Sequence, residues 1–158
     1  MDCLRVGKSK HGRGVYATKG FKKGQKIMDF GGKTATYDEI EAHYKEDEDY
    51  FVQISEDLYL GPSGSFDDYM NHSCNPNAGL RIAEGKAQLI AIRNIKKGDE
   101  VTWDYSTTMD EDDWEMECGC GHKKCRKSVR DFKHLPKEVK GEYIRLGIVP
   151  EYIIRRTD

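Results

Sequence analysis

The sequence has little net charge, few prolines and no long hydrophobic run. Its 158 residues include 26 Lys and Arg against 28 Asp and Glu, a formal net charge of −2, and 4 Pro. The longest apolar runs, such as Leu89–Ile92, are far shorter than the about 20 residues that cross a membrane. Residues 1–10 are charged and no apolar stretch follows them, so we expect no signal peptide and an intracellular, reducing location.

The residues that are present favour one globular unit. A chain of this length buries roughly two-thirds of its unfolded surface. Hydrophobic residues make up 37% of the chain, and 9 Tyr, 5 Phe and 2 Trp are available for a core. This composition excludes a disordered, collagen-like or coiled-coil chain.

Charge is distributed unevenly along the chain. Residues 1–117 hold 15 Lys and Arg and 23 Asp and Glu, a net charge of −8, whereas residues 118–158 hold 11 and 5, a net charge of +6. Two acidic clusters, in residues 38–49 and 110–117, supply much of the negative charge. Such clusters are usually solvated faces, but clustered charge also attracts a partner of the opposite sign.

Glycines interrupt short apolar and β-branched runs in the first part of the chain, a pattern typical of short strands joined by tight turns. Thr36 with Glu39 three residues later is a capping-box pattern and predicts a helix over residues 36–44. Helices are also expected over residues 136–146, which begin with proline, and after Pro150. The predicted fold class is therefore mainly β with a few short helices. The expected strands cover residues 15–18, 26–30, 50–54, 58–60, 80–83, 87–93 and 100–103.

Five cysteines, an odd number, argue against a disulfide framework in a chain without an export signal. Three of them, Cys118, Cys120 and Cys125, form a C-x-C-x4-C pattern relieved by glycines, which suits thiolate ligands of a tetrahedral zinc ion. A structural zinc ion needs a fourth ligand. The spacing leaves three alternatives for it: Cys74, Cys3 and His122.

Three further motifs carry groups suited to a polar ligand. Residues 10–14 read K-H-G-R-G, residues 71–77 read N-H-S-C-N-P-N, and residues 100–106 read E-V-T-W-D-Y-S. Glycines let a ligand approach the main chain closely, and side-chain amides beside an imidazole supply donors and acceptors. Taken singly, the three motifs are equally typical of a hairpin turn, a pair of Asx turns and the edge of a core strand.

In this order, and followed by C-G-C-G-H-K-K-C at residues 118–125, the motifs resemble the SET-domain protein lysine methyltransferases that carry a post-SET zinc motif. The resemblance runs from about Val6 to about Arg130 and is to short, bacterial-type members. It implies the SET fold, a β-clip with a pseudoknot, in residues 1–110. Residues 111–158 would then form a post-SET zinc segment and a helical tail.

The resemblance also implies the cofactor, the catalytic residue and the substrate channel. Tyr105 matches the catalytic tyrosine. Phe30 and Trp103 stand where the family lines its substrate channel, and the bulky indole favours monomethylation. S-adenosylmethionine is the expected cofactor, and the residues that match its contacts are His11, Gly12, Arg13, Gly14, Tyr50, Asn71 and His72.

For the metal, the family pattern makes Cys74 the fourth ligand of one structural zinc ion, beside Cys118, Cys120 and Cys125. Cys3 then remains a free thiol and His122 a loop residue. A site with four thiolates has no open position, so this zinc would be structural and not catalytic.

The implied substrate is a lysine of a basic protein, such as a histone, a histone-like protein or a ribosomal protein. The alternative is a non-catalytic SET-like module that binds basic proteins through the acidic clusters, and Phe30, where the family usually has a tyrosine, favours it slightly. We expect no membrane partner. No direct nucleic acid binding is expected either, because the body is acidic and the basic tail lacks a recognition element.

Overall fold

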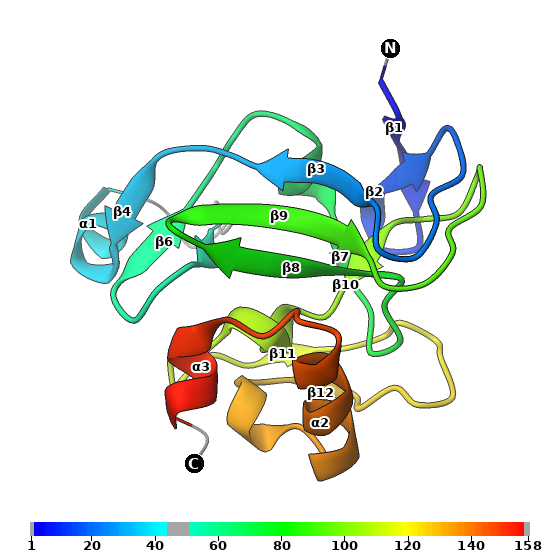
Figure 1. Ribbon diagram of the computed structural model, residues 1–158. Helices are drawn as coiled ribbons and strands as arrows, with labels where there is room; N and C mark the ends of the chain where they lie inside the picture. Colours follow the sequence, from blue (N-terminus) through cyan, green and yellow to red (C-terminus); the bar gives the residue numbers. More distant parts are fainter. Residues whose placement is uncertain (1, 44–50, 157–158) are drawn as a thin grey trace.

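The computed structural model describes residues 2–43 and 51–156 (Figure 1). In chain order the strands are β1 (Leu4–Ser9), β2 (Gly12–Ala17), β3 (Lys26–Phe30), β4 (Thr34–Thr36), β5 (Val52–Gln53), β6 (Leu58–Leu60), β7 (Asn71–His72), β8 (Ala78–Ala83), β9 (Lys86–Ala91), β10 (Thr102–Trp103), β11 (Met116–Glu117) and β12 (Ser128–Val129). The helices are α1 (Tyr37–His43), α2 (Lys137–Arg145) and α3 (Glu151–Arg156), with the 3₁₀ helices η2 (Phe66–Tyr69), η3 (Tyr105–Thr108) and η4 (Phe132–His134). The mainly β class with a few short helices is confirmed.

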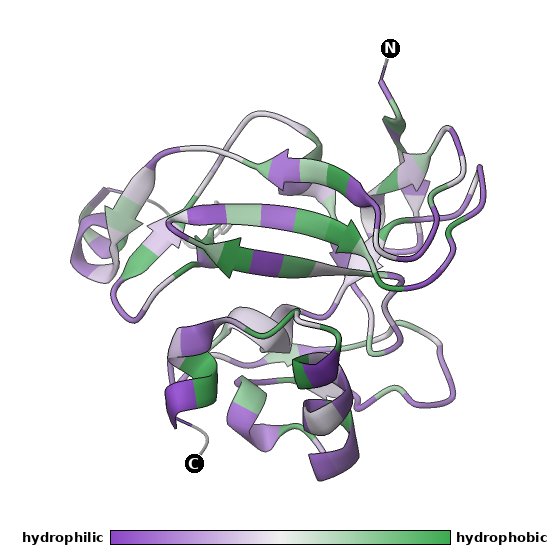
Figure 2. Cartoon of the chain, viewed as in Figure 1, coloured by the Kyte–Doolittle hydropathy of each residue, from purple (hydrophilic) through white to green (hydrophobic). Residues whose placement is uncertain are grey.

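The strands of the described residues pair in five small sheets. Two of them have three antiparallel strands, in the orders β3–β9–β8 and β4–β6–β5. Two antiparallel pairs, β1–β2 and β11–β12, and the parallel pair β7–β10 complete the set. The sheets surround a core in which Val15, Leu80, Leu89 and Val101 are fully buried. Figure 2 shows hydrophobic and hydrophilic residues alternating in the first part of β9, whereas the last part, residues 89–91, is hydrophobic and buried throughout.

The parallel pair brings together two motifs that are far apart in the sequence. Asn71 lies opposite Thr102, and His72 lies opposite Trp103. The side chain of Asn77 fastens the pair, because its Nδ2 donates to the Glu100 carbonyl at 2.8 Å and its Oδ1 accepts from the Thr102 N–H at 3.0 Å. The pairing therefore sets the N-H-S-C segment beside the W-D-Y segment.

The expected capping box is formed at the start of α1. The Thr36 N–H donates to the Glu39 carboxylate at 2.8 Å, and the Glu39 N–H donates to the Thr36 hydroxyl at 3.3 Å. The tail helices α2 and α3 are also present, and Pro136 occupies the N-cap position of α2 without a side-chain hydrogen bond. Among the described residues, none of the helices has the length and apolar character needed to span a membrane.

The tail packs under the β3–β9–β8 sheet and has an apolar cluster of its own (Figure 1). Phe132 and Ile148 are the most deeply buried members of this cluster, at 1% and 0% exposure. Ile148 meets the sheet at Gly79 of β8, where no side chain intervenes. The tail is thus attached to the sheet through a contact that depends on a glycine.

Replacing this glycine is expected to separate the tail from the sheet. A Cβ atom at Gly79 would lie 2.5 Å from Cγ2 and 2.8 Å from Cβ of Ile148, closer than real side chains approach. Gly79→Ala should therefore lower the free energy of unfolding by about 1–3 kcal/mol, measured by urea denaturation. In the double variant with Ile148→Ala, the two losses should be less than additive. An unchanged midpoint for Gly79→Ala would contradict this packing.

Candidate active site

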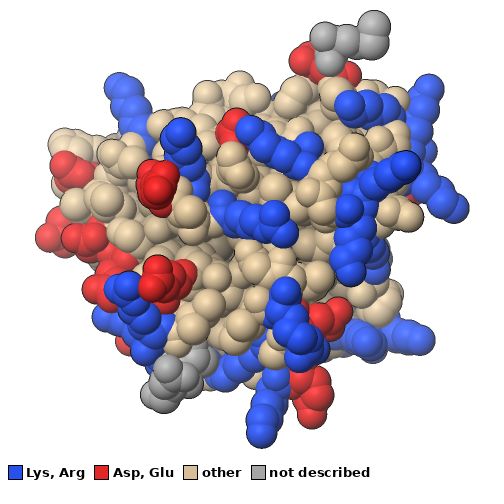
Figure 3. Space-filling model, viewed as in Figure 1, with Lys and Arg blue, Asp and Glu red and all other residues tan. Residues whose placement is uncertain are grey.

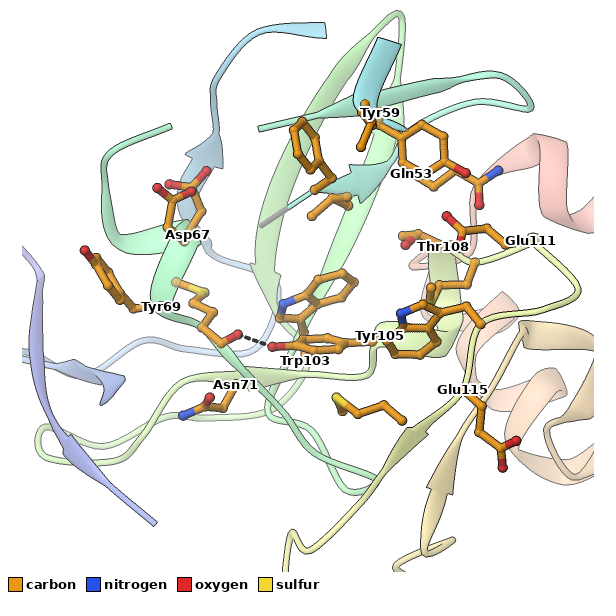
Figure 4. A pocket seen from close by; sticks show the side chains of 18 of the residues that line it. Gln53, Tyr59, Asp67, Tyr69, Asn71, Trp103, Tyr105, Thr108, Glu111 and Glu115 are labelled. Atoms are coloured by element: carbon orange, nitrogen blue, oxygen red, sulfur yellow. Dashed lines mark hydrogen bonds between the residues drawn. The ribbon is translucent and has the colours of Figure 1, made fainter. Parts of the chain in front are cut away.

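An open hollow of about 1340 Å³, the central hollow, lies between the β1–β2 hairpin and the β5–β6 pair (Figure 4). His11 and Arg13 line it on the hairpin side, and Gln53 and Tyr59 line it on the other. Tyr105 lies between these two sides (Figure 4). The hollow is therefore continuous from the predicted cofactor contacts to the predicted catalytic tyrosine.

Tyr105 is held by hydrogen bonds from its hydroxyl group and from its main-chain N–H. Its hydroxyl donates to the Met70 carbonyl at 2.5 Å, the bond drawn in Figure 4. Its N–H donates to Nδ1 of His72 at 3.1 Å. Its ring lies against those of Trp103 and His72, with centroids 4.9 and 5.3 Å away. The Tyr105 hydroxyl oxygen and the Met70 carbonyl oxygen consequently lie at fixed positions among aromatic rings.

Trp103 and Phe30 have different positions relative to the hollow. Trp103 lines it beside Tyr105. Phe30 is buried at 7% exposure, is not among the lining residues, and packs edge-on against Trp103 with centroids 5.8 Å apart. The assignment of both residues to a substrate channel stays a prediction. The position of Phe30 limits its part to supporting the indole.

The amide of Asn71 links the hairpin to the parallel pair. Its Nδ2 donates to the Arg13 carbonyl and to the Glu100 carboxylate, each at 2.8 Å, and lies 3.3 Å from the Ser9 hydroxyl. Within the described residues Oδ1 of Asn71 forms no hydrogen bond, and Asn71 lines the central hollow. Oδ1 is therefore an acceptor available to a ligand, the N and O atoms being assigned from this network.

Glu100 was missed as a candidate, although it begins the third motif. Its carboxylate accepts from Asn71 and from the Ser9 hydroxyl, at 2.8 and 2.9 Å. A Cβ atom at Gly14 would clash with this carboxylate and would lie 2.9 Å from the Ser9 Cβ. Contact with Glu100 thus accounts for Gly14 without a ligand. Cofactor binding by Gly12 and Gly14 stays a prediction, and Tyr50 lies outside the described residues.

His72 is buried between Tyr105, Asp104 and Cys74. Burial lowers its pKa to about 4, against the opposing charge of Asp104, so the ring is neutral near pH 7. Because Nδ1 accepts the Tyr105 N–H, Nε2 carries the proton and faces the Cys74 sulfur at 3.3 Å. His72 also lines a small side pocket with Lys10, His11 and Asn71.

Four cysteines converge next to this site. The sulfur atoms of Cys74, Cys118, Cys120 and Cys125 all lie within 4.8 Å of one another, and Cys74 and Cys118 are 3.6 Å apart. Tetrahedral ligands about 2.3 Å from a zinc ion lie roughly 3.8 Å apart, so the spacing suits such an ion. Of the three alternatives for the fourth position, the structure brings Cys74 into the cluster and neither Cys3 nor His122.

Burial and main-chain donors act in opposite directions on the thiols of this cluster. Burial raises the pKa of Cys74, while the Lys127 N–H lowers the pKa of Cys125 to about 6. The Arg126 N–H donates to the Cys74 sulfur and the Lys127 N–H to the Cys125 sulfur, both at 3.4 Å. A metal ion binds the thiolate forms, so zinc would displace the protons that burial keeps on the thiols of Cys74 and Cys118.

The lining of the central hollow is acidic. Asp67 and Asp68 are engaged by main-chain N–H groups at Gly31, Ser63 and Gly64. Among the described residues, the other lining carboxylates are Glu41, Glu111 and Glu115, and Arg13 is the one Lys or Arg on the lining. Figure 3 shows the opposite trend on the face of the β3–β9–β8 sheet, where Lys and Arg predominate and acidic side chains gather towards α1.

Glu111 interacts with Tyr59 on the β5–β6 side of the hollow. Burial and a hydrogen bond with Glu111 raise the pKa of Tyr59. Tyr37 of α1 similarly has a raised pKa, chiefly through a hydrogen bond with Glu41. This wall therefore combines aromatic surface with carboxylates, a combination that suits a cationic side chain or peptide.

Comparison with known proteins agrees with this arrangement. The sequence profile of the SET domain matches residues 12–106. Histone-lysine N-methyltransferase trithorax of Drosophila virilis is 30% identical over 128 residues, covering 74% of this chain and 3% of the relative. Histone-lysine N-methyltransferase ASHH3 of Arabidopsis thaliana is 29% identical over 149 residues, covering 87% and 40%. The chain thus spans a minor part of these relatives.

Solved structures show the same fold. KRYPTONITE in complex with mCHG DNA and SAH is similar with a TM-score of 0.64 and 26% identity, covering 80% of this chain and 29% of that one. A second KRYPTONITE structure, with mCHH DNA, an H3(1-15) peptide and SAH, has a TM-score of 0.63 and 24% identity. Since the profile covers more than half of the residues and places both the N-H-S-C and the W-D-Y motifs within it, the chain belongs to the SET-domain family.

Proposed function

We propose that this protein is an S-adenosylmethionine-dependent protein lysine N-methyltransferase that acts on a basic protein such as a histone or a histone-like protein. The observation that carries the proposal is the position of Tyr105. Its hydroxyl is fixed on the Met70 carbonyl in a hollow that reaches from Asn71 to an acidic, aromatic wall. The names of the relatives support the same reaction class.

The residues around Asn71 fit the proposed cofactor. S-adenosylmethionine, when bound, supplies a methyl group on a sulfonium, which is transferred to the lysine amine. Its amino acid part presents an ammonium group, and the available Oδ1 of Asn71 is a suitable acceptor for it. His11, Arg13, Asn71 and His72 would hold the cofactor, with Gly12 and Gly14 contributing main-chain groups.

The protein's part in the reaction is to neutralise and orient the substrate amine. A protonated lysine has no lone pair, and an aromatic surrounding lowers its pKa. Figure 4 shows the labelled carboxylates Asp67, Glu111 and Glu115 standing apart from the Tyr105 hydroxyl, so they do not hold the proton at the reacting point. The oxygens of Tyr105 and Met70 then orient the neutral amine.

The substrate class follows from the charge of the hollow. In the part of the chain that the structure describes, five carboxylates and one arginine line the hollow, and this excess of negative charge favours a peptide with several positive charges and raises its local concentration. One structural relative binds an H3(1-15) peptide, which is of this type. The bulk of Trp103, supported edge-on by Phe30, narrows the space beside Tyr105 and favours transfer of a single methyl group.

We propose also that the four cysteines bind one structural zinc ion. The metal would join Cys74 of the SET segment, residues 1–110, to the three cysteines of the post-SET segment, residues 111–158. Its part is to fix the loop of residues 118–125 against the hairpin, where a Cβ atom at Gly119 would lie 3.8 Å from Cε1 of His11.

Tyr105→Phe is expected to abolish turnover without unfolding the chain. Phenylalanine keeps the ring between Trp103 and His72 but removes the hydroxyl that orients the amine. The rate of labelled methyl transfer to core histones should fall at least about 100-fold, while the Kd for S-adenosylmethionine stays unchanged. Tyr16→Phe is the matched control, because its hydroxyl donates to the Lys8 carbonyl at 2.7 Å on the exterior.

Persistent activity in Tyr105→Phe would remove the tyrosine from this role. If the wild-type protein labels no basic protein and calorimetry shows no binding of S-adenosylmethionine, the enzyme proposal is contradicted. Retained binding of basic proteins would then identify the chain as a non-catalytic module.

Zinc content should depend on Cys74 and on none of the alternatives. Mass spectrometry of the purified protein is expected to find one zinc ion per chain in the wild type and in Cys3→Ser and His122→Ala. Cys74→Ser and Cys118→Ser should lose zinc and unfold at lower temperature, because each leaves an incomplete, buried set of thiolates. Loss of zinc in Cys3→Ser, or its retention in Cys74→Ser, would refute the ligand set.

A further inference from the structure

The carboxylate of Asp104, next to Tyr105, is bound by groups from the post-SET segment. Its side chain is fully buried. Arg126 donates to both of its oxygens, at 2.8 and 2.9 Å, and the Tyr143 hydroxyl of α2 donates to it at 2.9 Å. The Ser106 N–H donates to it locally at 3.1 Å. Two residues distant in the sequence therefore determine where this carboxylate lies.

The bonds from Arg126 and Tyr143 hold the Asp104 carboxylate firmly in one position. A buried carboxylate left without its cation is strongly unfavourable, and a bidentate arginine fixes its direction as well as its charge. Burial and the charge of Asp104 raise the pKa of Tyr143, which keeps its proton and remains a donor. The side chains of Arg126 and Tyr143 therefore fix the direction of the Asp104 carboxylate.

The other end of η3 is held by α3. The Tyr152 hydroxyl lies 2.6 Å from the Thr108 carbonyl and 2.9 Å from the Gln53 carbonyl. Thr108 is the last residue of η3, and Gln53 belongs to β5 on the far wall of the central hollow. One tail hydroxyl thus ties the end of η3 to the opposite wall.

The residues that follow η3 depend on the same segment. The Phe132 N–H donates to the Met109 carbonyl at 3.2 Å. The Asp131 carboxylate accepts from the N–H groups of Glu111 and Asp112, at 3.0 and 2.7 Å. The main chain from Asp104 to Asp112 is consequently attached to the tail at each of its turns.

We propose that Arg126, Tyr143 and Tyr152, here called the tail clamp, are positioning residues for methyl transfer. They hold the two ends of η3 and so keep the Tyr105 hydroxyl on the Met70 carbonyl, the point at which the amine is oriented. This inference rests on the proposed function for its kinetic consequence. It gives the helical tail a part in turnover, separate from target selection.

The clamp is separable from the packing of the tail. The apolar cluster of Phe132, Ile148 and Ile153 holds α2 and α3 without the two hydroxyls. A phenylalanine at position 143 or 152 keeps its ring in place and removes only the bond to η3. Such variants are therefore expected to fold while η3 shifts.

Kinetics of Tyr143→Phe and Tyr152→Phe test the clamp. Assayed well below their unfolding temperature, both variants should show kcat lowered about tenfold, because a displaced catalytic group loses its orientation. We expect wild-type values of the KM for the histone substrate, the Kd for S-adenosylmethionine and the zinc content. A lower stability alone would not reduce kcat while leaving these three quantities unchanged. Tyr16→Phe should match the wild type. Unchanged kcat in both tail variants would overturn the proposal.

A second readout does not require activity. With 3-fluorotyrosine at position 105, the fluorine resonance should move in Tyr143→Phe and in Tyr152→Phe and stay in place in Tyr16→Phe. An unmoved resonance in both tail variants would overturn the clamp. If the wild type transfers no methyl group, the proposed function fails, and this resonance still decides whether the tail positions Tyr105.

Discussion

The parallel pairing of β7 with β10 is the contact on which the rest of the site depends. It has two residues in each strand, and the amide of Asn77 binds two main-chain groups of the β10 segment, the Glu100 carbonyl and the Thr102 N–H. The pairing sets His72 beside Trp103, so the imidazole receives the Tyr105 N–H and faces Cys74. The proposed cofactor contact Asn71, the proposed catalytic residue Tyr105 and the proposed metal ligand Cys74 all lie within or close to this short ladder in the sequence.

The uneven charge of the chain has a structural use. The basic tail provides Arg126 for the buried Asp104, and it pairs Lys133 with Asp112 and Arg156 with Asp110. The latter two pairs are exposed and contribute little to stability, so their effect is mainly on orientation. The acidic cluster of residues 110–117 is therefore partly satisfied within the chain. Its glutamates Glu111 and Glu115 remain on the lining of the hollow.

Local signals in the sequence were sufficient for the elements that depend on local contacts. The strands at 26–30 and 58–60 and the capping box at Thr36 were predicted correctly. Strand β10 lies within the predicted strand of residues 100–103, but β7 was not predicted. Such a short strand has no periodicity and forms only through a distant partner. The spacing of Cys118, Cys120 and Cys125 indicated three metal ligands, and the family resemblance indicated Tyr105. The ion pair of Asp104 with Arg126 joins segments that no local pattern connects.

The central claim is that a lysine amine receives a methyl group in this hollow. It is tested most directly by incubating the protein with S-adenosylmethionine and a total extract of basic proteins, then locating added methyl groups by mass spectrometry. The account predicts one added methyl group on lysine side chains that lie within positively charged segments. Methyl groups found on other residue types, or on none, would contradict it.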